Sequence, residues 1–74
     1  MDTLERLRLE QRMEISREIN IYRVKGVKTE REKLEFKILS QMEQRLDQGA
    51  TYGGVASMLW FKHAKIEDLR SFLA

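Results

Sequence analysis

His63 is the only histidine in the 74-residue chain and the only side chain of the usual general-base type. Nucleophilic catalysis would require a nucleophile, such as Ser57, and an orienting carboxylate, such as Asp68, to lie beside it. A single histidine near a helix end is more typical of a surface or capping residue. We therefore predict no catalytic residue and a protein that is not an enzyme.

Metal-binding and phosphate-binding patterns are equally weak. The sequence has no cysteine, so it offers no thiolate ligand for zinc and no disulfide. Glu10, Glu14 and Glu18 recur at intervals of four, a spacing typical of the solvated face of a helix. Gly53 and Gly54 are not followed by the lysine of a phosphate-binding loop. We expect no metal site and no cofactor.

Composition favours one small folded domain over residues 1–74. With 42% hydrophobic and 35% charged residues, the chain is too apolar for a typical disordered protein and too charged for a membrane protein. Its longest apolar run, residues 58–61, is far shorter than a membrane span, and the charged start MDTLERLRLEQR differs from a signal peptide. We expect a cytoplasmic protein with no membrane partner.

Glycines divide the chain into three segments, each of which has a helical pattern. There is no proline, and glycine occurs at positions 26, 49, 53 and 54. The first segment can begin with Asp2 as N-cap and Glu5 three residues later. A short strand around Ile19 and Ile21 is the alternative, but no second strand is available to pair with it. The apolar stripe of this helix consists of Leu4, Leu7, Ile15, Ile19 and Tyr22.

The second segment carries clear start and stop signals for a helix. Thr29 and Glu32 have the spacing of a capping box, and Gly49 can adopt the left-handed conformation that ends a helix. The short connection between the two segments makes the helices neighbours. The sequence therefore predicts an antiparallel helical hairpin of about 2–25 and 30–48. The stripe of the second helix consists of Leu34, Ile38, Leu39, Met42 and Leu46.

The third segment cannot easily be one straight helix. A single helix over 53–73 would place Lys62 and Lys65 within its apolar face, and burying unpaired ammonium groups is costly. A break between Phe61 and Lys65 avoids this, so the all-α fold ends in one bent helix or two short helices (about 53–61 and 64–73). We expect Trp60 to face a partner while four neighbours face the core: Val55, Met58, Leu59 and Phe61.

The apolar register of this segment resembles the DNA-binding helix-turn-helix. The residues in matching places are Val55, Ala56, Leu59, Phe61, Ile66 and Leu69. The pattern departs from the motif at the turn, where Trp60 replaces the common glycine, and on the groove-facing side, where Glu67 and Asp68 would repel phosphates. The resemblance implies a small DNA-binding regulator that uses residues 52–73.

The DNA-binding hypothesis also relies on a patch of basic residues. The window 23–33 holds five cationic residues against Glu30 and Glu32, and cations of this kind give nucleic-acid binding its affinity. The residues that would contact DNA are Arg23, Lys25, Lys28, Arg31, Lys33, Lys62 and His63.

Apolar residues outside the three stripes favour a protein partner instead. Leu9, Met13 and Val24 lie on the back of the first helix, Phe36 lies off the second stripe, and Trp60 lies off the third. A chain of this size buries only about 60% of its unfolded surface, so a lone core is marginal and further contact would stabilise it. Exposed apolar patches mark interfaces. We therefore expect a small regulatory or adaptor protein that binds another protein and self-associates, with a homodimer favoured.

Overall fold

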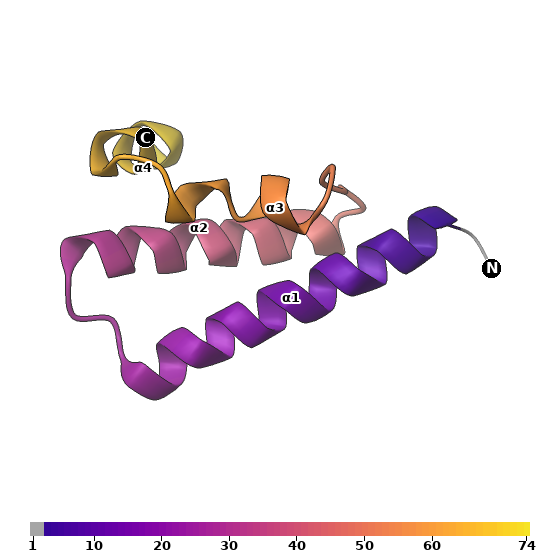
Figure 1. Ribbon diagram of the computed structural model, residues 1–74, viewed down its shortest axis with the longest axis horizontal. Coiled ribbons are helices and arrows are strands. Elements are labelled where there is room, and N and C mark those ends of the chain that lie inside the picture. Colours follow the sequence, from indigo (N-terminus) through magenta and orange to yellow (C-terminus); the bar gives the residue numbers. More distant parts are fainter. Residues whose placement is uncertain (1–2) are drawn as a thin grey trace.

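Two long helices form an antiparallel hairpin in the computed structural model, which describes residues 3–74 (Figure 1). Helix α1 spans Thr3–Lys25 and α2 spans Glu30–Asp47. These bounds confirm the predicted hairpin, and the residues that could have formed a strand lie inside α1. The predicted N-cap Asp2 lies outside the described residues.

Three short helical elements follow and lie along α2, on the side away from α1 in the view of Figure 1. They are α3 (Val55–Met58), the 3₁₀ helix η1 (Trp60–Lys62) and α4 (Ile66–Leu73). The predicted break is therefore confirmed, and it separates η1 from α4. The described residues contain helices and turns but no strand, so the all-α prediction is also confirmed.

Local hydrogen bonds explain where α2 begins and ends. The Thr29 hydroxyl accepts from the Glu32 backbone N–H, and the Glu32 carboxylate accepts from the Thr29 N–H, both at 3.1 Å. At the other end Gly49 has a φ of +101°, and the N–H groups of Gly49 and Ala50 donate to the carbonyls of Leu46 and Arg45 at 3.1 and 3.0 Å. This is a Schellman motif, which needs the left-handed residue that Gly49 supplies. Both predicted signals are confirmed.

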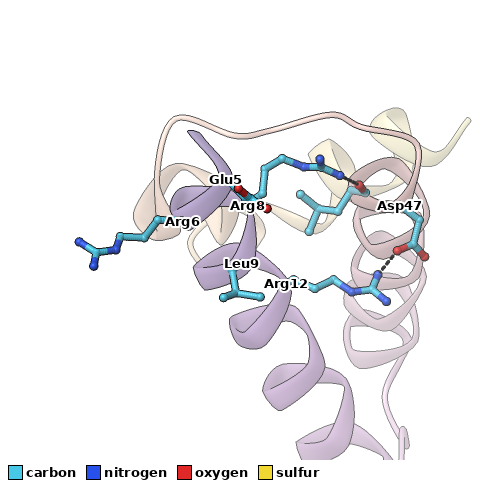
Figure 2. A pocket seen from close by; sticks show the side chains of 7 residues that line it. Glu5, Arg6, Arg8, Leu9, Arg12 and Asp47 are labelled. Atoms are coloured by element: carbon cyan, nitrogen blue, oxygen red, sulfur yellow. Dashed lines mark hydrogen bonds and ion pairs between the residues drawn. The ribbon is translucent and has the colours of Figure 1, made fainter. Parts of the chain in front are cut away.

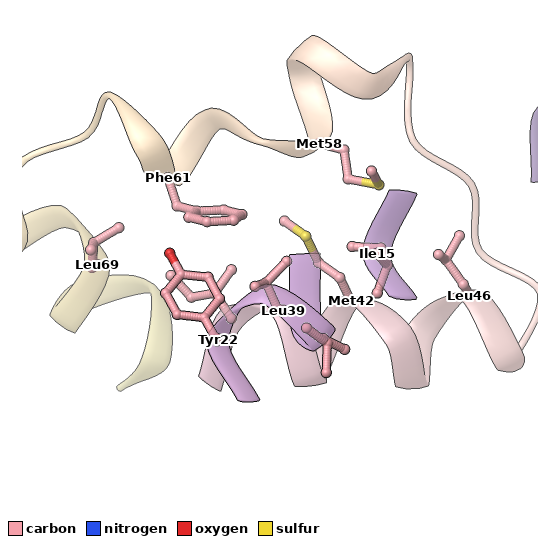
Figure 3. Close-up of a cluster of buried hydrophobic side chains, with 10 residues drawn as sticks. Ile15, Tyr22, Leu39, Met42, Leu46, Met58, Phe61 and Leu69 are labelled. Atoms are coloured by element: carbon pink, nitrogen blue, oxygen red, sulfur yellow. The ribbon is translucent and has the colours of Figure 1, made fainter. Parts of the chain in front are cut away.

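The core lies where α1, α2 and the C-terminal elements meet (Figure 3). Four of the five residues of the predicted α2 stripe are buried in it, and Leu34 packs against it. From α1, however, Leu4 is 54% exposed and Leu7 is half-buried, so the first turns were wrongly assigned to the core. These turns extend past the end of α2 (Figure 1). The buried apolar residues are Ile15, Ile19, Tyr22, Ile38, Leu39, Met42, Leu46, Met58, Phe61 and Leu69.

The short elements contribute Met58 and Phe61 to this core, as predicted. Leu59 is only half-buried, and the Val55 side chain lies outside what the structure describes. The lysines that argued against a single helix, Lys62 and Lys65, are both exposed. The turn between η1 and α4 therefore keeps both ammonium groups off the apolar core, and the Lys62 ammonium is paired with Glu18.

The capping box gives the domain a specific sensitivity to acid. The pKa of Glu32 falls from its ordinary value of 4.5 to about 2, first because the Thr29 backbone N–H donates to the carboxylate and then because Lys25 lies beside it. A lowered pKa stabilises the fold above the unfolded value, and this stabilisation is lost as the pH falls from about 4.5 to 2. We expect the melting temperature to drop over that window. Glu32→Gln should remove this part of the drop, and NMR titration of Glu32 near 4.5 would contradict the assignment.

Candidate interaction surface

The side of α1 that faces away from the core carries three strongly exposed apolar residues. Leu9 is 62% exposed, Met13 66% and Val24 80%. The hairpin partner α2 and the short elements all lie on the other side of α1 (Figure 1). We call Leu9, Met13 and Val24 the outer face of α1. Their exposure is as the sequence predicted.

Phe36 and Trp60 occupy a different environment from the outer face. Both are half-buried and pack against the core cluster. The Phe36 ring meets the edge of Tyr22 at a centroid distance of 6.2 Å, and the Trp60 ring lies 5.2 Å from that of Phe72. Each therefore offers only part of its ring to a partner, and their role in binding stays a prediction.

Three of the predicted DNA-contacting cations are used inside the molecule. Arg31 donates to the carbonyls of Phe61 and Lys62 at 2.9 and 3.3 Å and lies 3.6 Å from the Glu35 carboxylate. Lys62 pairs with Glu18, and Lys25 pairs with the carboxylate of the capping box at 3.1 Å. These contacts fasten η1 and the hairpin together. The remaining four, Arg23, Lys28, Lys33 and His63, are exposed.

Two of these carboxylates, Glu18 and Glu35, belong to a buried polar cluster that the sequence analysis missed. Glu18 and Glu35 are 6% and 8% exposed, and the Tyr22 hydroxyl donates to Glu35 at 2.9 Å. Burial, followed by this hydrogen bond, raises the pKa of Tyr22 above its ordinary value. Each buried carboxylate has a cation beside it. The cluster therefore joins α1, α2 and η1.

Gln11 is a second buried polar residue that the sequence analysis missed. It is fully buried, and its side-chain amide makes two hydrogen bonds to one backbone unit: Nε2 donates to the Tyr52 carbonyl at 2.6 Å, and Oε1 accepts from the Tyr52 N–H at 3.0 Å. The signal was available, because Gln11 lies one helical turn before Ile15, on the apolar stripe. The amide holds the connection between α2 and α3 against α1.

Two arginines of α1 bind groups in the last turns of α2, next to the Gln11–Tyr52 contact (Figure 2). Arg8 donates to the Leu46 carbonyl at 2.8 Å, while Arg12 donates to the Glu43 carbonyl at 3.4 Å and pairs with Asp47. Cations are favourable here, since the last carbonyls of a helix lack intrahelical partners. A shallow hollow of about 390 Å³ opens beside these arginines, with Leu9 and Leu46 as its apolar lining.

Comparisons of this chain with protein-family models, with curated proteins and with solved structures give no match. No helix formed by residues 3–74 combines the length and apolar character that crossing a bilayer requires.

Proposed function

We propose that the protein is a small non-catalytic regulatory or adaptor protein that acts by protein–protein contact through the outer face of α1. The observation that carries the proposal is the exposure of Leu9, Met13 and Val24 on one side of one helix. Single exposed apolar residues are ordinary, but several along one face are typical of an interaction site. Methionine suits such a site because its flexible side chain adapts to a partner.

The polar groups of the protein support the same proposal. The buried acids Glu18 and Glu35 are paired with Lys62 and Arg31. The Lys62–Glu18 pair and the hydrogen bonds from Arg31 to the Phe61 and Lys62 carbonyls hold η1 in place. His63 is exposed at the C-terminal end of η1. Among the described residues it does not belong to any cluster of acidic side chains. The charged residues thus join η1 to the hairpin, and the exposed apolar residues of α1 remain for contact with a partner.

Site-specific photocrosslinking tests the proposal. A benzophenone amino acid placed at Met13, in cells that naturally make the protein, should give protein adducts that survive nuclease treatment. The same probe at Gln44, an exposed position on α2, is the matched control and should give few adducts. Equal labelling from both positions, or adducts that nuclease removes, would contradict a protein-binding role for the outer face.

DNA binding is the second candidate, supported by the exposure of Arg23, Lys28 and Lys33 around the α1–α2 connection. Duplex binding should weaken steeply as salt rises, and replacing these three residues by glutamine should flatten the slope. The C-terminal unit offers less support, because α3 has only four residues and a 3₁₀ helix follows it. Glu67 and Asp68 also occupy the exposed first turn of α4.

A further inference from the structure

We propose that a groove between α2 and α4 binds a short acidic segment of a partner protein, in which carboxylates flank an apolar side chain. This inference goes beyond the proposed function, because the groove lies apart from the outer face of α1. Helices α2 and α4 pack beside each other (Figure 1), and a hollow of about 520 Å³ opens between them. We call it the α2–α4 groove. Its lining includes Leu34, Phe36, Lys37, Arg70 and Leu73.

The apolar part of the groove is surface that the core leaves uncovered. Leu34 and Phe36 of α2 and Leu73 of α4 pack against the core cluster, but each is only half-buried and also lines the hollow. The groove thus gives the free part of the Phe36 ring a place in a binding site. Its volume lies in the range of ligand pockets, so it suits a few side chains of an extended peptide.

The charged part of the groove is cationic. Lys37 and Arg70 line it from α2 and α4, and none of its described lining residues is acidic. The α2 positions three and four residues from Lys37 hold no acid, and Lys33 lies one turn before it. Both lysines are exposed, and neither belongs to an ion pair among the described residues. Their ammonium groups are therefore available to a partner.

Arg70 is oriented at the edge of the groove by Glu30. Its Nε and Nη2 donate to Oε1 of Glu30 at 3.0 and 2.7 Å. These bonds hold the guanidinium in place but use only part of its fork of N–H donors, so it can donate to a second carboxylate as well. With Lys33 and Lys37, this side of the molecule carries three cations against the single carboxylate of Glu30.

Charge distinguishes the α2–α4 groove from the hollow at the end of α2. There Glu5 and Asp47 lie in the lining with the arginines, and Asp47 already pairs with Arg12. An acidic segment would meet like charges in that hollow, whereas the α2–α4 groove offers it opposite charges. Charges at the rim of an interface select the partner and speed its association, and the apolar centre excludes water. An apolar residue flanked by Asp or Glu matches both parts of the groove.

Selection from a phage-displayed library of random heptapeptides tests this chemistry. With the natural protein as bait, the enriched peptides should carry Asp or Glu on either side of a leucine or an aromatic residue. At low salt Lys37→Glu should bind a selected peptide about tenfold more weakly, because an attractive contact becomes repulsive. Lys28→Glu reverses an exposed charge on the connection after α1 and is the matched control, which should bind within about twofold of the natural protein. Equal melting temperatures check that both variants fold.

NMR titration locates the bound peptide. The amide signals of Ser40, Gln41 and Leu73 should shift, while that of Met13 should not. Selected peptides without acidic residues, a selection that enriches none, or equal affinity of Lys37→Glu and the natural protein would overturn the inference. Duplex DNA that displaces the peptide and shifts the same signals would also overturn it, since the groove would then recognise phosphate.

The outcome is independent of the crosslinking test of the outer face of α1. That test is read from Met13, which is on α1, and its control position Gln44 does not line the α2–α4 groove. Failure of the peptide selection would therefore leave the proposed function standing.

Discussion

Replacing Phe61 by alanine is expected to lower the free energy of unfolding by about 3 to 5 kcal/mol. Phe61 is fully buried and is the largest side chain in the core with no exposed surface. Its ring lies between the C-terminal elements and the hairpin, near Tyr22 and Leu39 (Figure 3). Small domains have only about 5 to 15 kcal/mol of stability in total. Loss of this ring should therefore leave the variant largely unfolded, as urea titration followed by circular dichroism can show.

The neighbouring Trp60 provides the comparison. Its ring is half-buried and packs edge-on against Phe61 and Phe72, so Trp60→Ala should destabilise the fold clearly less than Phe61→Ala. Leu59→Ala should also fall near or below the low end of the range for a buried leucine, about 2 kcal/mol, because Leu59 is half-buried. If Trp60→Ala proves as damaging as Phe61→Ala, Trp60 is a core residue and has no surface left for a partner.

Features encoded within a few neighbouring residues could be predicted from the sequence. The start of α2 depends on Thr29 and Glu32, and its end depends on Gly49, so each boundary follows from groups that are close in the chain. The break before α4 could be inferred as well, because two lysines on an apolar face made the alternative costly. The exposure of the outer face of α1 followed from helical periodicity alone.

Features that depend on contacts between distant residues could not be predicted in the same way. Glu18 looked like part of a solvated face until the fold brought Lys62 beside it. Leu4 matched the stripe of α1 but is exposed. The first turns of α1 extend past the end of α2 (Figure 1), and periodicity does not tell where a partner helix stops. Periodicity placed Trp60 off the apolar stripe, but α4 folds back and places Phe72 against its ring.

Gln11 offers the sharpest test of the polar contacts that position the C-terminal elements. Replacing it by leucine would leave both the N–H and the carbonyl of Tyr52 without their present partner. An unpaired buried polar group costs about 1 to 3 kcal/mol, so we expect Gln11→Leu to lose about 2 to 4 kcal/mol of stability. Gln44→Leu, on the exposed side of α2, should change stability by less than about 0.5 kcal/mol.

Gln11→Glu separates hydrogen bonding from side-chain shape, because the two side chains have nearly the same size. At neutral pH a buried carboxylate can accept from the Tyr52 N–H but cannot donate to the Tyr52 carbonyl, and its charge is poorly solvated. Burial raises the pKa of such a carboxyl in the folded state, so stability is retained below about pH 4.3 and is lost as the pH rises through the folded value. Relative to the natural protein at the same pH, Gln11→Glu should therefore be strongly destabilised at pH 7 and nearly equal at pH 4, where the protonated acid can donate as the amide does. Equal stability at both pH values would mean that the amide does not hold Tyr52, and that α3 and η1 are positioned by their apolar contacts alone.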